Sequence, residues 1–198
     1  MLLVEGPTQS SSFTNKKMKP FLQRVSKHLP LKQIIHQSEN KEKILVLERF
    51  NILSMENGPG LVLHRFVHSD PDRGYHDHPW TFGVSLILSG GYREIKVKHG
   101  TMEMSERVFK TGNINFFSGN DYHRVLLFQK DDQLSRDKET TCVPEEEDVW
   151  TLFFYWKREK VWGFLKESDK CDQKWEYNQY SKTIEDTDGA WWKKGSTT

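Results

Sequence analysis

From residue 43 onward the chain alternates apolar and polar residues in short runs, which Gly, Asn and Asp turns separate. Alternation with a period of two is typical of β-strands that bury one face. The runs read KILVLERFNIL, GLVLHRFVH, FGVSLILSG, YREIKVKHG, ERVFKTG, INFF, HRVLLFQ and VWTLFFYW. No helical segment lies between them to serve as the crossover that parallel strands need. The pattern therefore predicts a mainly β fold, a sandwich or small barrel of antiparallel strands.

Four segments are expected along the chain. Residues 1–18 are polar and are expected to form a flexible N-terminus. Residues 19–42 form an extension with apolar residues at helical spacing, which Pro30 is expected to divide into two short helices. The barrel is predicted to span 43–165, and 166–198 form a C-terminal extension.

Two parts of these segments have their own character. Residues 130–148 are strongly acidic and carry little to bury, which predicts a solvated loop within the barrel. The C-terminal extension is polar but carries several aromatic residues that are costly to expose as a group. Part of it is therefore expected to dock on the barrel; its aromatic residues are Trp175, Tyr177, Tyr180, Trp191 and Trp192.

Composition limits the classes of function. The 198 residues suit one domain with extensions, and the net charge of +1 does not predict a nucleic-acid partner. No apolar run approaches the length of a membrane span, and the N-terminus does not read as a secretory signal. Cys142 and Cys171 are far apart in polar surroundings and suggest neither a disulfide framework nor a zinc motif. A reduced, cytoplasmic setting is expected, and the oligomeric state is not predicted.

The segment YHDHPW contains two histidines that we expect to share one metal ion. Residues i and i+2 of a strand project to the same face, so His76 and His78 point in the same direction. A third ligand must come from elsewhere, and His123 opens another predicted strand after a Gly/Asn turn. Val125 and Leu127 share the parity of His123 and are expected to line the interior. The alternative for each histidine is a buried structural role.

The region around this pair resembles the first motif of the cupin family, G-x5-H-x-H-x4-E-x6-G. His76, His78 and Gly90 fit its spacing. Asp70 stands in place of the opening glycine, and Gly83 stands where the family has a glutamate ligand.

A second cupin motif, G-x5-P-x-G-x2-H, resembles the segment that ends at His123. Gly112 and His123 fit its spacing, with Ser118 in the proline place and Asn120 in the glycine place. The resemblance covers roughly residues 43–165. It implies a cupin-type, double-stranded antiparallel β-barrel of the jelly-roll kind, with a metal between its two sheets.

The resemblance is nearest to the thiol dioxygenases, and to cysteine dioxygenase above all, because these have a His-Asp-His segment without the glutamate and an HRV at the third ligand. It implies a three-histidine site formed by His76, His78 and His123, with positions left for substrate and O2. Ferrous iron is the expected ion, and neutral imidazoles also suit Zn, Ni, Mn or Cu. Gly83→Glu is expected to add a carboxylate ligand and to change both metal affinity and reactivity.

The same comparison suggests three residues around the metal. Cysteine dioxygenase holds the carboxylate of its substrate with an arginine on an early strand, for which Arg49 and Arg65 are the two candidates. It also has a tyrosine near the iron, and Tyr155 occupies a comparable place. For each residue the alternative is an ordinary surface or core role.

Other polar residues near the motifs leave alternatives open. His64 and His68 share one face of a strand. One reading is that they contact the metal ligands or supply a further ligand. The other is that one is a buried structural histidine and one is exposed.

Glu94 is expected to be an exposed strand residue, with metal ligation as the alternative. Asp77 is expected to point away from the metal. Trp80 is expected to wall the pocket if the strand stays regular through Pro79, and the alternative is that Pro79 breaks the alternation.

Three functions remain open from the sequence. The first is a non-haem iron oxygenase acting with O2 on a small polar substrate, such as a thiol or an amino acid. The second is a metal-dependent isomerase, lyase or hydrolase of the same fold. The third is a cupin that binds a ligand without converting it.

Overall fold

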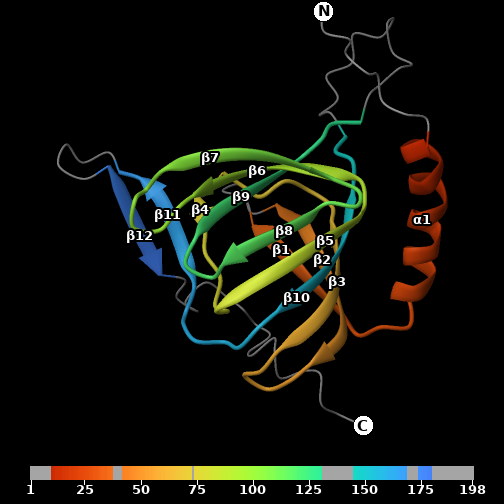
Figure 1. Ribbon diagram of the computed structural model, residues 1–198, viewed down its shortest axis with the longest axis horizontal. Coiled ribbons are helices and arrows are strands. Elements are labelled where there is room, and N and C mark those ends of the chain that lie inside the picture. Colours follow the sequence, from red (N-terminus) through yellow and green to blue (C-terminus); the bar gives the residue numbers. More distant parts are fainter. Residues whose placement is uncertain (1–9, 38–41, 73, 131–144, 169–173, 180–198) are drawn as a thin grey trace, which may run out of the picture.

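The structure is a computed structural model that describes residues 10–37, 42–72, 74–130, 145–168 and 174–179. The described chain forms two six-stranded sheets that face each other, with one helix against the outside of the first (Figure 1). The elements are α1 Ser10–Ser26, β1 Leu31–Gln37, β2 Lys43–Ser54, β3 Gly60–Phe66, β4 Tyr75–His76, β5 Phe82–Ser89, β6 Gly91–Val97, β7 Met104–Lys110, β8 Ile114–Ser118, β9 Tyr122–Leu127, β10 Val149–Tyr155, β11 Gly163–Glu167 and β12 Trp175–Gln179.

The strand order is that of a jelly roll. The first sheet runs β1-β2-β3-β10-β5-β8, and the second runs β12-β11-β4-β9-β6-β7. Every pairing is antiparallel, and the eight central strands pair from the outside inward: β3 with β10, β4 with β9, β5 with β8, and β6 with β7. This is the arrangement of one long hairpin rolled up into two sheets. The antiparallel β fold predicted from the alternation is confirmed, and so is the jelly roll that the cupin resemblance implies.

The helical extension differs from the prediction. The only described helix begins at Ser10, within the segment expected to be flexible, and it ends at Ser26 before Pro30. Residues 31–37 are not a second helix but strand β1, which pairs antiparallel with β2. The apolar residues of this segment fit both periods, and exposure alternates along it from Leu31 to His36. The segment forms a strand rather than a helix because pairing with the edge of β2 satisfies its backbone hydrogen-bonding groups.

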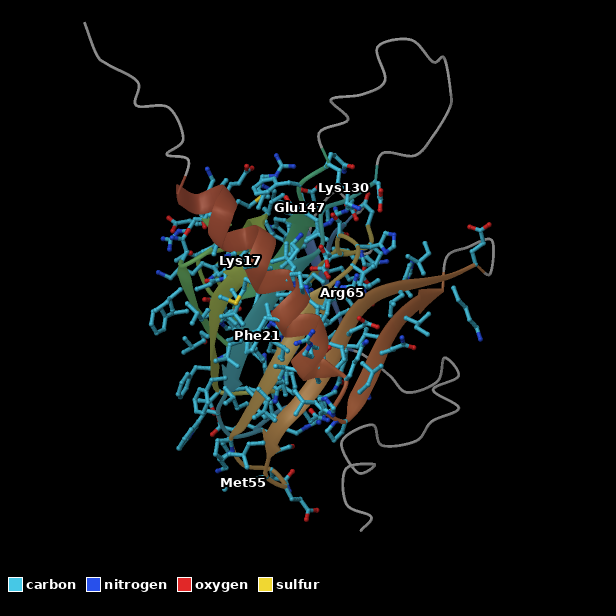
Figure 2. The ribbon with its side chains drawn as sticks, turned by 90° about the vertical axis from the view of Figure 1, so that its right-hand side faces the viewer. Lys17, Phe21, Met55, Arg65, Lys130 and Glu147 are labelled. Carbon is cyan, nitrogen blue, oxygen red and sulfur yellow. The ribbon has the colours of Figure 1, made fainter. Side chains whose placement is uncertain are left out.

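Helix α1 lies across the outer face of the first sheet (Figure 2). Leu22 is 5% exposed and packs with Phe50, Leu63 and Trp150 of three different strands. Two ion pairs also hold α1 against the sheet, because Lys19 Nζ lies 2.7 Å from Asp148 Oδ1 and 3.1 Å from Glu147 Oε1. The outer face of β3 and β10 is thus covered, and the interior of the barrel remains for the site.

We expect Leu22→Ala to lower the free energy of unfolding by about 2–4 kcal/mol, because the substitution removes buried methyl groups and leaves a cavity under α1. Phe21→Ala is the matched control, since Phe21 is 59% exposed on the same helix and its loss should change stability by less than about 0.5 kcal/mol. Denaturant unfolding followed by tryptophan fluorescence measures both. Equal losses for the two variants would contradict the packing of α1.

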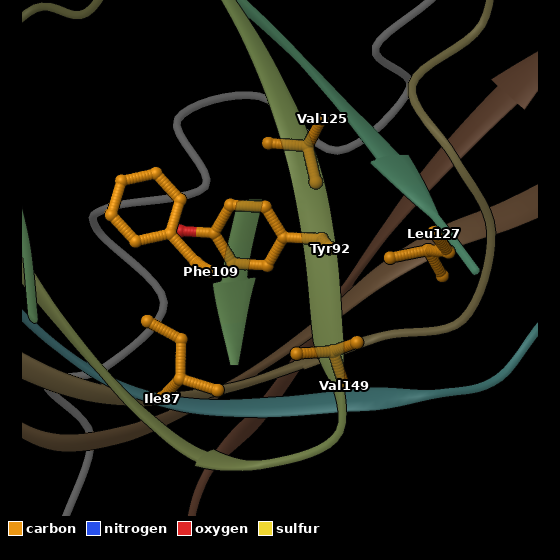
Figure 3. Packing of buried hydrophobic residues seen from close by; sticks show 6 residues of the cluster. All are labelled: Ile87, Tyr92, Phe109, Val125, Leu127 and Val149. Carbon is orange, nitrogen blue, oxygen red and sulfur yellow. The ribbon is translucent and has the colours of Figure 1, made fainter. Parts of the chain in front are cut away.

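A compact apolar cluster fills the end of the barrel interior where β5, β7 and β9 end and where β6 and β10 begin. Its residues come from both sheets and surround the ring of Tyr92 (Figure 3): Ile87, Tyr92, Phe109, Val125, Leu127 and Val149. Val125 and Leu127 are 4% and 6% exposed, so their predicted inward direction is confirmed. The cluster fills this end of the interior, and two of its members, Tyr92 and Val125, also line the cavity described below.

The C-terminal extension adds two strands to the second sheet. β11 pairs with β4, and β12 pairs with β11, so that Trp175 is 9% exposed and packs against Tyr75 at a ring distance of 5.9 Å. The expected docking is therefore seen for Trp175, whereas Tyr180, Trp191 and Trp192 lie outside the described residues. Most of the acidic loop, residues 131–144, also lies outside them. The described helix is too short and too polar to cross a bilayer.

Candidate metal centre

Within the described part of the chain, three histidines come together in the way expected of a metal site. One ring nitrogen from each of His76, His78 and His123 lies within 4.8 Å of the other two. Strand pairing explains this, because β4 and β9 are neighbours and His76 is directly opposite His123. His78 projects from the same side as His76 two residues later, and its Nε2 lies 2.8 Å from Nε2 of His123. Since an ion binds imidazole nitrogen at about 2.0–2.1 Å, the three histidines fit one ion.

Glu94 contradicts the sequence prediction, which placed it at the surface. It is 1% exposed, and its Oε1 accepts hydrogen bonds from His123 Nδ1 at 2.7 Å and from Asn115 Nδ2 at 2.9 Å. Burial by itself would raise the pKa of Glu94, but the bonds from His123 and Asn115 lower it to about 2. A carboxylate behind Nδ1 fixes the tautomer of an imidazole and directs its Nε2 lone pair toward the metal.

His76 also has a carboxylate on its far side. Its Nδ1 lies 3.7 Å from Asp70 Oδ2, an oxygen that also accepts a 2.7 Å hydrogen bond from the backbone N–H of Val125. Asp70 stands at the position where the cupin motif has its opening glycine. It ties the loop before β4 to β9, and so to the strand of the third histidine.

His78 is held by aromatic rings. It stacks on Trp80 at 5.2 Å and lies 4.7 Å from the ring of Phe117. Desolvation, followed by the proximity of His123 and His76, lowers the pKa of His78 well below its usual value. The ring is therefore neutral, which is the form that binds a metal. Trp80 walls the cavity as predicted.

Asp77, between the two histidines, points away from the centre as expected. It is 1% exposed, and its Oδ1 accepts a 2.6 Å hydrogen bond from the backbone N–H of Gly163. Its Oδ2 is paired with Lys160. Asp77 thus anchors the His-Asp-His segment to β11.

The three histidines open onto a cavity of about 150 Å³ inside the barrel. This volume suits a ligand of benzene size. The walls are mostly apolar and aromatic; the lining includes Val46, Leu47, Phe66, Trp80, Phe117, Val125, Phe153 and Trp162, with Arg49 and His64 among its polar members.

The two candidate arginines lie on opposite faces of the first sheet. Arg49 lines the cavity and is 7% exposed, and burial lowers its pKa to about 10, so that it remains charged at neutral pH. Arg65 faces outward, where its guanidinium contacts Glu48 at 3.1 Å and Asp148 at 3.0 Å. The structure therefore brings Arg49, and not Arg65, to the histidine cluster.

Tyr155 lies beside the site but not among the residues that line the cavity. Its ring stacks on Trp80 at 4.7 Å, and its hydroxyl lies 3.2 Å from Ser54 Oγ near the surface. Trp80 thus separates this hydroxyl from His78, and the position does not match the expected role beside the metal.

Aromatic rings fill the space beside Gly83, the position where the cupin motif has a glutamate. A Cβ on Gly83 would overlap the Phe117 side chain and approach Phe153 within 2.9 Å. The expectation that Gly83→Glu adds a ligand is therefore wrong, because the side chain has no room to extend from this position.

The two histidines of the GLVLHRFVH segment, His64 and His68, take different positions. His64 is 5% exposed and accepts a hydrogen bond from Arg49, whereas His68 is exposed with its Nδ1 2.7 Å from the carbonyl oxygen of Leu45. The option of one structural and one exposed histidine fits these positions. The pairing of His64 with Arg49, and that of Glu94 with His123, were not identified from the sequence.

Comparison with known proteins gives a fold likeness only. No family model and no curated protein matches the sequence. An oxalate oxidase structure aligns with 11% identity over 54% of this chain and 46% of its own, with a TM-score of 0.38. An Fe(II) HppE structure with substrate aligns with 9% identity over 66% of this chain and 58% of its own, with a TM-score of 0.45. A predicted oxalate decarboxylase from Thermotoga maritima aligns with 15% identity over 67% of this chain and 96% of its own, with a TM-score of 0.42.

The chain thus spans less than half of the oxalate oxidase chain that it matches. At such low identity and TM-score these likenesses carry no argument about chemistry. The fold assignment rests on the strand pairing, and the site on the positions of its own side chains.

Proposed function

We propose that this protein is a metal-dependent enzyme of the cupin type, most simply a non-haem iron oxygenase that acts on a small anionic substrate. The observation that carries the proposal is the convergence of His76, His78 and His123 on a mostly apolar cavity that Arg49 also lines. Three neutral nitrogen ligands suit ferrous iron, and Zn, Ni, Mn or Cu are the alternatives. When bound, ferrous iron would supply activation of O2 next to the substrate.

The residues of the chain then have separate tasks. His76, His78 and His123 hold the ion, and Glu94 keeps His123 oriented. Arg49 holds the anionic end of the substrate by charge-assisted hydrogen bonds. The aromatic walls around Trp80 and Phe117 exclude water from the reacting atoms.

Neither Tyr155 nor Arg65 belongs to this set. We propose that Tyr155 supports the ring of Trp80 by stacking on its far side. Arg65 joins β3 to Glu48 of β2 and to Asp148, the residue before β10, through its two ion pairs on the outer face.

The test is oxygen uptake by the iron-loaded protein with cysteine, 3-mercaptopropionate and other small acids, and with cysteamine as a thiol that lacks a carboxylate. We expect uptake with at least one acid. We expect Arg49→Ala to raise its KM by about 30–160-fold, the effect of losing a charged hydrogen bond of about 2–3 kcal/mol. Arg65→Ala is the matched control, because that arginine lies on the outer face of the same sheet and should leave KM unchanged.

Two experimental results would contradict the proposal of an oxygenase and favour another function. Turnover under strict anaerobiosis would leave a Lewis-acid isomerase, lyase or hydrolase as the better account. Stoichiometric binding of metal and acid without any conversion would leave a ligand-binding protein.

A further inference from the structure

Arg49 and His64 are a cross-strand pair inside the barrel. The register of β2 and β3 places them directly opposite each other, and both side chains line the cavity. Arg49 Nε donates a hydrogen bond of 3.0 Å to His64 Nε2. One edge of the guanidinium is therefore engaged by the barrel itself rather than by a ligand.

The ring of His64 is held firmly enough to direct its partner. It stacks on Phe153 at 4.9 Å with an interplanar angle of 21°, and it meets the edge of Phe66 at 5.8 Å. Burial, followed by the charge of Arg49, lowers the pKa of His64 well below its usual value. The imidazole is therefore neutral and can offer Nε2 as an acceptor.

The other side of the guanidinium rests on an aromatic ring. Arg49 Cζ lies 5.5 Å from the centroid of Trp80, within the range of a cation–π contact. Trp80 in turn stacks on His78, one of the three histidines at the metal centre. His64 and Trp80 together thus set the position of the cation relative to the histidine cluster.

We propose that His64 is a positioning residue that holds Arg49 as a preformed site for one carboxylate of a small organic acid, whose apolar body fills the cavity. This deepens the proposed function, on which it rests for the assignment of Arg49 to the substrate. A flexible arginine loses rotamer entropy when it binds an anion, and prior fixation by His64 removes part of that cost. The cavity volume limits the acid to a few non-hydrogen atoms besides the carboxylate.

The experiment uses the full-length, metal-free protein, and its readout is binding rather than turnover. Propionate is compared with propionamide, which has the same shape without the charge, by NMR titration of the amide resonances. We expect propionate to bind at least about tenfold more tightly, as a charged hydrogen-bond partner requires. Arg49→Met should abolish the preference, and Arg65→Met should leave it intact.

Two substitutions of His64 separate positioning from packing. His64→Phe keeps a ring on Phe153 but removes the acceptor, and it should weaken propionate binding about tenfold with little effect on propionamide. His64→Gln keeps an acceptor and should restore propionate binding to within about threefold of the wild type. If His64→Phe does not fold, Arg49→Lys replaces it, since lysine keeps the charge but lacks the Nε–H and the fork; it should lose most of the preference.

Wild-type affinity for propionate in His64→Phe, or in Arg49→Lys where that variant serves, would overturn the positioning role. Equal binding of propionate and propionamide by the wild type would overturn the anion site. Because metal is absent from this assay, a failure of iron binding or of oxygen uptake leaves its result intact and counts only against the proposed function.

Discussion

Replacing His123 by alanine is expected to leave the barrel folded and to lower its affinity for a divalent metal by more than about 100-fold. Loss of a group behind a ligand typically costs about 10–100-fold in metal affinity, and loss of the ligand itself removes more. The same result is expected for His76→Ala and His78→Ala, because the three ring nitrogens form one cluster. Metal content after dialysis and titration against a chelator of known affinity measure the effect.

His28→Ala is the control for nonspecific binding by histidine. His28 is exposed after the end of α1, on the outside of the first sheet, and its loss should leave metal content unchanged. Circular dichroism and thermal unfolding without metal establish that each variant is folded. Unchanged metal content in all three site variants would remove the metal centre and, with it, the proposed enzyme.

The fold and the three histidines were accessible from the sequence because both depend on local pattern. Period-two alternation identifies strands that bury one face, and the parity of a strand determines that His76 and His78 project together. The spacing of the second motif then identified His123. None of these steps requires knowledge of which strands are neighbours.

Residues whose role depends on strand neighbours could not be assigned in this way. Glu94 sits on β6, and only the pairing of β6 with β9 places it inside the barrel beside His123. The choice between Arg49 and Arg65 had the same difficulty, because it depends on which face of β2 and of β3 is covered by α1. The sequence named both arginines but contained no signal for the inner one.

Strand β1 illustrates a different limit. Leu31, Ile34 and Ile35 are compatible with a helix, and the register shift between Ile34 and Ile35 disturbs the simple alternation that would have indicated a strand. Pairing with the edge of β2 decides the conformation, and that edge is a tertiary property. The conformation of β1 matters for the site, because Ile34 and His36 of this strand line the cavity.

Replacement of Glu94 by glutamine is expected to weaken metal binding by about 10–100-fold without removing any ligand. Glutamine has nearly the same shape and can still accept from His123 Nδ1, but it lacks the charge that makes the imidazole more basic. The carboxylate is well placed for this task, because it is almost fully buried and takes hydrogen bonds from both His123 and Asn115. The expected loss is therefore electrostatic, with the fold preserved.

Glu106→Gln is the matched control, since Glu106 lies on the neighbouring strand β7 in an exposed ion pair with Arg93 and should not affect metal affinity. Chelator competition measures the affinities, and the visible spectrum of the cobalt-substituted protein reports whether the coordination geometry is retained. Weaker binding with an unchanged cobalt spectrum is the expected result, because Glu94 acts through His123. A changed spectrum would mean that Glu94 is itself a ligand, and the three-histidine centre would then be a three-histidine, one-carboxylate centre. Unchanged affinity would mean that packing alone orients His123, and that the buried charge of Glu94 serves another purpose in the barrel.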